Sequence, residues 1–401
     1  MRKGWEIKKF SEVYDVRDGT HDSPEYVNKG YALITSKNLK EDRINYDKVN
    51  YISEEDYINI NKRSKVDKGD VLFAMIGTIG NPVVVLENPN FAIKNVALFK
   101  VPKNQNSNYL KFYLDSPIVI SKMTKDAKGA TQKFVGLGYL RNFEIPLPPL
   151  SEQQEIVSIL DYAFESIERA KSNTEQNLKN AKDLFDSYLQ NIFEKKGKNW
   201  EEKTLGEACK VERGSSPRPI DKFFTEDIEG VNWIKIGDTK HVDKYIYSTR
   251  QKITKDGALQ SRFVDIDDFI LSNSMSFGKP YIMKTQGYIH DGWFVLRLPK
   301  NIDTEFFWYL LASPYTMNQF VSLASGAIVK NISGDLVKKT ILPIPPLNDQ
   351  KKLVKKLDDL SKETKRLENM YLQKLNDLEE LKKSILQKAF NGELKTSKIS
   401  A

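Results

Sequence analysis

The sequence predicts an α+β protein. Two mixed α/β domains alternate with two long helices that pair as an antiparallel coiled coil, and the whole is an internal repeat with pseudo-two-fold symmetry. Three observations carry this prediction. Short strings recur at a nearly constant offset, short apolar runs between turn residues are typical of strands, and two stretches of about forty residues carry an apolar stripe at helical spacing. The 401 residues suffice for several domains with separate cores.

The repeat extends over nearly the whole chain. GWE at 4–6 recurs as NWE at 199–201, and IPLPPL at 145–150 recurs as LPIPPL at 342–347. Gly129, Ala130 and Lys133 recur as Gly326, Ala327 and Lys330. Because chance matches would scatter, these strings indicate a duplication. The repeat predicts globular domains at 1–145 and 198–342, each followed by a helical region, at 146–197 and 343–401.

Within the globular domains, apolar runs bounded by Gly, Asn or Asp predict strands. The runs lie at 71–76, 83–86 and 96–99 in the first domain and at 269–271 and 293–296 in the second, and helical stretches lie at 108–114 and 305–311. Each long helix follows a Pro-rich segment. Ser151, with Gln154 three residues on, and Asn348 are the expected N-terminal caps, and Gly197 and Gly392 are the expected C-terminal ends.

The long helices show a 4–3 alternation of apolar residues, which is typical of a coiled coil. The expected core residues are Ile156, Leu160, Ile167 and Leu184 in the first helix and Leu353, Leu357, Leu360, Leu367, Leu378, Leu381 and Ile385 in the second. Asn177 and Lys374 interrupt the two stripes at equivalent positions. They are either tolerated imperfections or a device that fixes the register of the helix pair.

The first helix leaves one domain and runs into the other, so at 1.5 Å per residue it is about 65 Å long. Antiparallel packing on it supplies the second helix with a partner for its apolar stripe. Two domains held at a fixed separation suit duplex DNA, where helical pitch sets the spacing of half-sites. Because the domains have diverged, with ITSKN at 34–38 opposite IKIGD at 234–238, we expect an asymmetric bipartite target.

The composition suggests an anionic partner and argues against a disulfide, a structural metal and a membrane span. Lys and Arg total 62 against 54 Asp and Glu, and this net charge of +8 suggests an anionic partner. One cysteine excludes an internal disulfide and a thiolate zinc cage, and the three histidines lack ligand spacing, so we expect no structural metal. With no run long enough to span a bilayer and no secretory signal, we expect a soluble, cytoplasmic protein.

The sequence lacks the catalytic motif of methyltransferases and the phosphate loop of ATP-hydrolysing enzymes. The string nearest to the Asn-Pro-Pro-aromatic motif of a methyltransferase is NPNF at 88–91, which lacks the second proline and suits a turn. No GxxxxGK[ST] phosphate loop occurs, so ATP hydrolysis is not expected in this chain.

Taken in order, several strings resemble those of the specificity subunits of type I restriction–modification systems, and the resemblance covers essentially the whole chain. The strings are KGDVLF at 68–73, GTIG at 77–80, GATQK at 129–133, the proline-led segment 145–153 and LQKAFNGEL at 386–394. The second copy departs slightly, with NDQ at 348–350 where the first has SEQ at 151–153.

The resemblance implies two target-recognition domains, 1–145 and 198–342, separated by two conserved helical spacers, 146–197 and 343–401, the latter including the C-terminal tail. Such a subunit performs no chemistry itself. It recruits two methyltransferase subunits and restriction/translocase subunits to double-stranded DNA, at two half-sites with an unread spacer between them. S-adenosylmethionine, ATP and Mg²⁺ are then expected in the partner subunits, and no cofactor is expected in this chain.

Candidate DNA contacts are basic or hydrogen-bonding side chains at strand ends beside glycine turns, because such groups bind phosphates and base edges. In the first domain they are Lys37, Asn38, Thr78, Lys94, Asn95, Thr131, Gln132 and Lys133. In the second they are Lys235, Asp238, Asn273, Ser274, Ser276, Lys279, Lys330 and Asn331. A solvated turn is the alternative for each of them.

Two other functions stay open at this level. One is a stand-alone enzyme, which the missing motifs argue against, and the other is a coiled-coil scaffold whose end domains bind protein. Phe164 and Phe185 suit either a methyltransferase interface or contacts between the coiled coil and the globular domains. Lysine pairs at 351–352, 355–356 and 382–383 suit either spacer phosphates or a solvated helix face.

Overall fold

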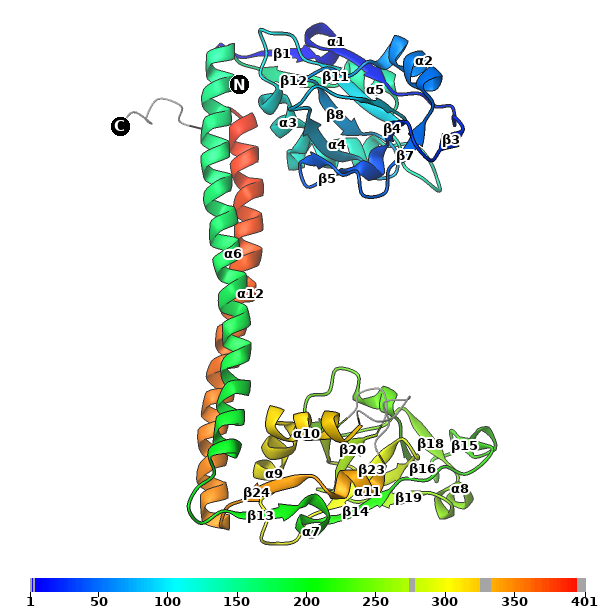
Figure 1. The fold of residues 1–401 in the computed structure, drawn as a ribbon, viewed down its shortest axis with the longest axis vertical. Coiled ribbons are helices and arrows are strands. Elements are labelled where there is room, and N and C mark those ends of the chain that lie inside the picture. Colours follow the sequence, from blue (N-terminus) through cyan, green and yellow to red (C-terminus); the bar gives the residue numbers. More distant parts are fainter. Residues whose placement is uncertain (1, 3, 274–277, 325–332, 395–401) are drawn as a thin grey trace. The chain divides into compact units, whose positions relative to one another are not determined.

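The computed structural model describes residues 2, 4–273, 278–324 and 333–394. The chain divides into two compact units, residues 1–174 with 373–401, and residues 175–372. Each unit contains one globular domain and a segment of both long helices, α6 (Leu150–Lys195) and α12 (Leu347–Phe390) (Figure 1). None of the helices in the described ranges combines the length and the apolar character that a membrane span requires.

The first domain alternates short strands and helices. In chain order its elements are β1 (Glu6–Lys9), α1 (Phe10–Val13), β2 (Asp15–Asp18), β3 (Tyr26–Val27), β4 (Tyr31–Ile34), the 3-10 helix η1 (Ser36–Asn38), β5 (Leu39–Lys40), β6 (Arg43–Ile44), β7 (Asn50–Ile52), α2 (Glu54–Ser64), β8 (Val71–Ala74), β9 (Gly80–Val84), β10 (Phe91–Ile93), β11 (Val96–Lys100), α3 (Ser107–Asp115), α4 (Pro117–Asp126), α5 (Leu137–Asn142) and β12 (Glu144–Leu147).

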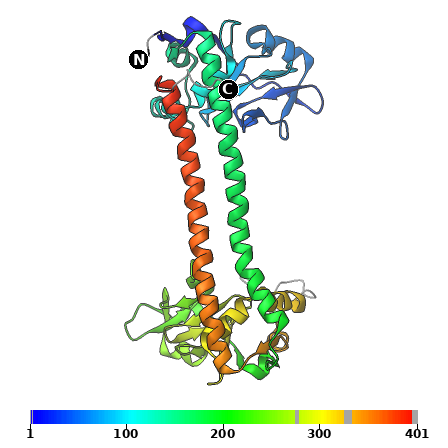
Figure 2. The same ribbon diagram turned by 90° about the vertical axis from the view of Figure 1, so that its left-hand side faces the viewer.

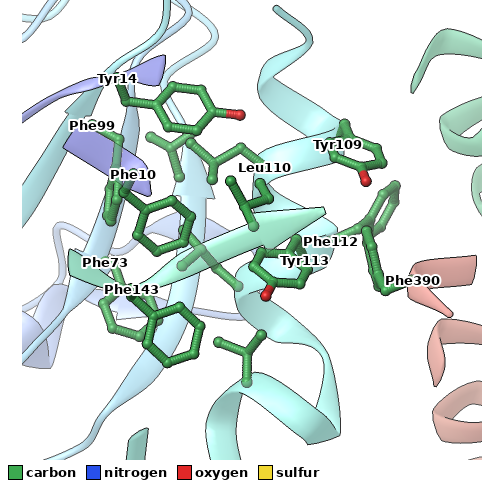
Figure 3. Close-up of a cluster of buried hydrophobic side chains, with 14 of the residues drawn as sticks. Phe10, Tyr14, Phe73, Phe99, Tyr109, Leu110, Phe112, Tyr113, Phe143 and Phe390 are labelled. Carbon is green, nitrogen blue, oxygen red and sulfur yellow. The ribbon is translucent and has the colours of Figure 1, made fainter. Parts of the chain in front are cut away.

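Two four-stranded sheets form the body of this domain, in the orders β2-β11-β8-β9 and β10-β4-β7-β3. The chain passes from one sheet to the other between β10 and β11, through a turn at Lys94 and Asn95 in which Asn95 has φ +54°. An aromatic cluster packs one face of the first sheet, with the rings of Phe10 and Phe99 5.1 Å apart (Figure 3). The cluster includes Phe390 of α12, whose ring lies 5.4 Å from that of Tyr109, so it fastens the end of the long helix to the domain.

The second domain repeats this plan with its own elements. They are β13 (Glu201–Thr204), α7 (Leu205–Ala208), β14 (Lys210–Arg213), η2 (Ile220–Lys222), β15 (Phe224–Thr225), β16 (Val231–Ile234), η3 (Ile236–Thr239), β17 (Tyr245–Ile246), β18 (Gln251–Ile253), α8 (Lys255–Leu259), β19 (Arg262–Val264), β20 (Phe269–Ser272), β21 (Pro280–Met283), β22 (Gly287–Ile289), β23 (Trp293–Arg297), α9 (Thr304–Ala312), α10 (Pro314–Ala324), α11 (Gly334–Lys338) and β24 (Ile341–Ile344).

Two five-stranded sheets build the second domain, in the orders β14-β23-β20-β21-β17 and β15-β18-β16-β22-β19. Strands β8 and β11 confirm the runs at 71–76 and 96–99, and β20 and β23 confirm those at 269–271 and 293–296. Helices α3 and α9 confirm the predicted helical stretches. The short pairing strands β3, β5 and β6 were not predicted, since two-residue strands leave no periodic signal.

In each domain the first strand pairs with the last. Strands β1 and β12 are antiparallel, with Glu6 opposite Leu147, and β13 and β24 pair in the same way, with Glu201 opposite Ile344. The predicted domain boundaries at 145 and 342 fall inside β12 and β24, so the Pro-rich segments begin as strands. The chain consequently enters and leaves each domain at one place.

The long helices begin one residue before their predicted caps. Helix α6 starts at Leu150 and α12 at Leu347, so Ser151 and Asn348 lie inside the first turn and the predicted cap assignment is wrong. At the other end of α6, Lys196 (φ +43°) takes the left-handed conformation expected of Gly197, whereas after α12 Gly392 (φ +76°) does so as predicted.

A buried glutamine ties each helix start to its domain. Oε1 of Gln153 accepts a hydrogen bond from the backbone N–H of Asn106 at 3.1 Å, and Nε2 donates to the Pro148 carbonyl at 2.9 Å. Gln350 repeats the arrangement, accepting from the Asp303 N–H at 2.7 Å and donating to the Pro345 carbonyl at 2.8 Å. Both side chains are fully buried. Because Asn106 and Asp303 are the N-caps of α3 and α9, each glutamine joins a long helix to a domain helix.

Within each unit, segments of α6 and α12 lie side by side and antiparallel (Figure 2). In the first unit Lys171 Nζ lies 2.7 Å from Glu379 Oε1, and Lys382 Nζ lies 3.9 Å from Glu168 Oε1. The later position on one helix thus meets the earlier position on the other, which confirms the predicted antiparallel pairing.

The inward-facing stripe follows a longer period than predicted. Ile156, Leu160, Ile167 and Leu357 are buried, and Leu353, Leu360, Leu367, Leu378 and Ile385 are partly buried. Beyond Ile167, however, the inward positions of α6 are 170, 174, 178, 181, 185 and 189. These steps repeat every eleven residues, at about 3.67 residues per turn, and not every seven.

The predictions at the shifted positions are therefore wrong. Leu184 and Leu381 are 51% and 46% exposed, because Phe185 and Lys382 take the inward positions. Asn177 and Lys374 are exposed as well, so neither is a buried register device. Their neighbours Leu178 and Leu375 are half-buried in their place, and the apolar stripe is continuous there.

Two phenylalanines of α6 join the helices to the domains. The ring of Phe164 lies 5.5 Å from that of Phe112 in α3, and the ring of Phe185 lies 6.0 Å from that of Tyr309 in α9. Of the two alternatives for these residues, contact with the globular domains is the one that the structure supports.

Candidate nucleic-acid interface

The candidate residues of the first domain gather into two groups. The first surrounds the turn between β10 and β11. Lys94 N–H donates to the Ile34 carbonyl at 2.8 Å, and the Ser36 hydroxyl donates to the Asn95 carbonyl at 3.2 Å. These bonds bring the Lys94–Asn95 turn beside η1, which carries the exposed Lys37. The Lys94 ammonium donates to Ser23 Oγ at 2.5 Å.

The second group consists of two adjoining loops, the turn between β8 and β9 and the segment 129–134. Gly77 N–H donates to the Lys133 carbonyl at 2.8 Å. A Cβ on Gly77, which has φ +79°, would stand 3.0 Å from Gln132 Nε2, so glycine permits this close approach. The candidate side chains in these loops, Thr78, Thr131, Gln132 and Lys133, are all exposed.

Two asparagines among the candidates belong to the framework of the domains. Asn38 is 6% exposed, and its Oδ1 accepts from the Thr35 N–H at 3.0 Å while Nδ2 donates to the Asn45 carbonyl at 3.0 Å. Asn273 is 5% exposed and donates from Nδ2 to the Asp291 carbonyl at 2.8 Å. The side-chain amides of both residues bind backbone groups and hold loops, so we no longer propose Asn38 and Asn273 as base contacts.

The other candidates of the second domain that the structure describes are Lys235, Asp238 and Lys279. Lys235 is exposed and its ammonium donates to Gln251 Oε1 at 2.8 Å, whereas Asp238 caps η3 by accepting the Lys235 N–H at 2.8 Å. Lys279 is half-buried, donates to the Val242 carbonyl at 3.1 Å and lines a cavity of about 410 Å³ against the long helices. Ser274, Ser276, Lys330 and Asn331 lie outside the described residues.

Each domain has a cleft beside the segment that follows its strand β2 or β14. In the first domain the cleft, of about 490 Å³, is lined by 20–24 and by residues of α2 that include Asn59 and Arg63. In the second it is about 340 Å³ and is lined by 216–218, Lys235, His290 and Asp291 among others.

A glycine permits the close packing beside each cleft. A Cβ on Gly19 would stand 2.3 Å from the Ile93 carbonyl oxygen, and one on Gly214 would stand 2.0 Å from the His290 carbonyl oxygen. No other residue type fits at that distance without a backbone shift. The backbone beside the two clefts is therefore arranged alike, although the side chains that line them differ.

The electrostatics of the clefts differ as well. In the first, Arg63 provides a guanidinium and His21 an imidazole, and the Lys94 ammonium donates to Ser23, a residue of the cleft lining. In the second, burial lowers the pKa of His290, although the nearby Asp291 carboxylate acts in the opposite direction. The Arg218 guanidinium is 84% exposed and lies 3.7 Å from the Asp291 carboxylate.

The described part of the chain offers neither a reactive thiol nor a metal-ligand cluster. Burial raises the pKa of the Cys209 thiol to about 12, so no thiolate nucleophile forms there. Among the residues that the structure describes, no three His, Cys, Asp or Glu side chains are grouped so that they could hold a metal ion. The arrangement offers hydrogen bonds and charge, which suits binding.

Sequence reasoning missed His21, Arg63, Arg218 and Asp291. His21 and Arg218 lie in polar strings that follow a strand, HDSP at 21–24 and SSPR at 215–218, and this signal was available. Arg63 sits near the end of an amphipathic helix, where a basic residue is ordinary, and no sequence signal distinguishes it.

Comparisons with known proteins agree with this organisation. The model of the type I restriction modification DNA specificity domain matches residues 2–180 and again 197–379. The chain is 25% identical to a candidate specificity subunit of the type I restriction enzyme MjaX of Methanocaldococcus jannaschii, over 98% of this chain and 94% of that one. It is 24% identical to the EcoKI specificity subunit of Escherichia coli K12, over 72% of this chain and 66% of that one.

Solved structures share the fold. A chain from a study of complex assembly and conformational transition in the type I R-M system matches with a TM-score of 0.75 and 19% identity, over 98% of this chain and 99% of that one. The HsdS subunit of Thermoanaerobacter tengcongensis matches with a TM-score of 0.64 and 20% identity, over 98% of both chains.

Proposed function

Because this chain belongs to the family of type I restriction–modification DNA specificity domains, we propose that it selects the DNA target of such a system and directs the partner subunits to it. The observation that carries the proposal is the duplicated family domain whose two clefts share a framework and differ in their side chains. Each domain binds one half-site, and because the clefts differ, the two half-sites have different sequences. The helix pair determines the length of the unread spacer.

The proposal extends to the division of labour in the complex. This chain contributes recognition and no catalysis, in keeping with its family and with the missing methyltransferase and phosphate-loop motifs. Two methyltransferase subunits bind it, one for each copy of the repeat, and restriction/translocase subunits join the assembly. S-adenosylmethionine, ATP and Mg²⁺ are held by those partners.

The methylation pattern of DNA tests this function directly. We expect that co-expression with the neighbouring methyltransferase, in a host lacking other adenine methylation, yields modified adenines in a single asymmetric bipartite motif. Sequencing that detects modified bases gives both half-sites and the spacer at once. Unmodified DNA, despite a stable complex with the methyltransferase, would contradict the proposal and favour a protein-binding scaffold. A palindromic motif would retain DNA targeting but contradict the two different ends.

The dependence of binding on salt separates DNA recognition from protein scaffolding. We expect the affinity of the methyltransferase complex for its duplex to fall about 10³-fold or more between 50 and 200 mM salt, because roughly 6–10 phosphate contacts release counterions. Fluorescence anisotropy with a labelled duplex measures this slope. A scrambled duplex of equal length should show weaker binding at every salt concentration. Affinity that is independent of salt would count against a DNA-binding surface.

A further inference from the structure

A buried carboxylate holds an exposed arginine in the cleft of the first domain. The side chain of Asp18, at the end of β2, is 5% exposed, and that of Arg63, in the last turn of α2, is 63% exposed. The Arg63 guanidinium donates to Asp18 Oδ1. The Arg63 backbone is held as well, because Arg17 Nη1 donates to the Arg63 carbonyl at 3.2 Å. Most of the guanidinium N–H groups are left to face the cleft.

His21 completes the support from the other side. Its Nε2 lies 3.0 Å from Asp18 Oδ2, and its Nδ1 lies 2.8 Å from Asn95 Oδ1. Both oxygens of Asp18 and both ring nitrogens of His21 are thus engaged within the domain. Arg63 keeps further N–H donors beyond this bond, and the ion pair with Asp18 orients its guanidinium before any ligand arrives.

We propose that Arg63 reads a guanine of the first half-site in the major groove, with Asp18 as its positioning residue. The inference rests on the proposed function and names a base that the site selects. A guanidinium can donate two parallel N–H bonds to O6 and N7 of guanine, the commonest specific contact between proteins and DNA bases. Fixing the orientation of the planar guanidinium on a buried carboxylate suits the fixed geometry of a base edge, whereas a lysine would bind there only as a point charge.

The second domain has an arginine, and not a carboxylate, at the position of Asp18. Arg213 stands at the end of β14, where Asp18 stands at the end of β2, and its Nε donates to the Asp291 carbonyl at 3.3 Å. A guanidinium at this position cannot hold a second arginine by an ion pair. In the second cleft Arg218 pairs instead with Asp291, whose side chain is 47% exposed, and the other half-site provides an internal control.

Competition binding tests the inference with the complete complex of this chain and its methyltransferase, at one salt concentration. Duplexes carry each base pair of both half-sites replaced in turn. Arg63→Lys keeps the charge but loses the two-pronged geometry, so preference for one G·C pair of the first half-site should fall roughly 5- to 150-fold while the others are unchanged. Asp18→Asn should weaken the same preference and no other. Lys94→Met, the control, should weaken binding to all duplexes alike.

The outcomes are distinguishable. If Arg63→Lys weakens binding equally for every duplex, Arg63 contacts a phosphate and the inference is overturned. Unchanged preference at every G·C pair overturns it as well. Because Arg63 is exposed, we expect Arg63→Lys to fold and its urea unfolding midpoint to match that of the unmodified chain. The variant therefore tests whether Arg63 reads a base even if Asp18→Asn does not fold. A wild-type complex without sequence-specific binding would refute the proposed function itself, whereas a normal bipartite motif insensitive to Arg63 refutes only this inference.

Discussion

Replacing Gln153 by leucine is expected to lower the free energy of unfolding of the first unit by about 2–6 kcal/mol, and Gln350→Leu should do the same to the second unit. Each glutamine is fully buried and satisfies a backbone N–H and a backbone carbonyl of its domain. Leucine fills the space but leaves these groups unpaired, at about 1–3 kcal/mol each. Urea unfolding followed by circular dichroism measures the loss, and hydrogen exchange assigns it to a unit.

Exposed glutamines of the same helices supply the controls. Gln154→Leu and Gln387→Leu alter the surface only, and their unfolding midpoints should stay close to that of the unmodified chain. Equal stability of Gln153→Leu and Gln154→Leu would show that the buried amide does not join helix to domain. The motif that contains these glutamines would then have another purpose.

Lengthening both long helices by two eleven-residue repeats is expected to lengthen the DNA spacer by about one helical turn while leaving both half-sites unchanged. Two repeats add about 33 Å at 1.5 Å per residue, close to the turn of about 34 Å in duplex DNA. Insertion after Thr174 and after Leu372, where the two units divide, preserves the observed eleven-residue stripe. The methylated motif, read by sequencing, should gain roughly ten base pairs between its halves.

A single eleven-residue repeat in each helix is the matched control. It keeps the apolar stripe and the fold, but it extends the helices by about half a turn of DNA, which presents the second half-site on the opposite face. Methylation should therefore fall sharply with the single repeat and return with the double one. Altered half-sites, or an unchanged spacer after the double insertion, would refute a helix pair that measures DNA.

Repetition and periodicity made most of the fold predictable. The nearly constant offset between the copies and the apolar runs led to the domains, to strands such as β8 and β20, and to α6 and α12. The predicted seven-residue period was wrong. Core positions counted by heptads coincide with those of an eleven-residue repeat over the first turns and differ by one residue further along the helix. This is why Ile156 and Leu160 are buried as predicted and Leu184 and Leu381 are exposed.

The candidate site was less predictable, because its residues lie far apart in the sequence and meet only in the folded chain. A polar side chain at a strand end looks the same in sequence whether it is exposed, as Lys37 is, or holds a loop, as Asn38 and Asn273 do. Arg63 acquires its significance from Asp18, 45 residues earlier, and only folding brings them together. The exposed candidates that no observation tests, including Thr78 and Gln132, stay predictions.

The pairing of first and last strands also bears on how such a protein evolves. Because β1 is fastened to β12 and β13 to β24, each domain is a module whose two ends meet, and substitutions or insertions within it need not disturb the helices. Recombination that exchanges one module transfers a complete recognition surface in a single event. The lineage can thus acquire a new specificity at one end while the other end, and the machinery that depends on the helices, is inherited intact.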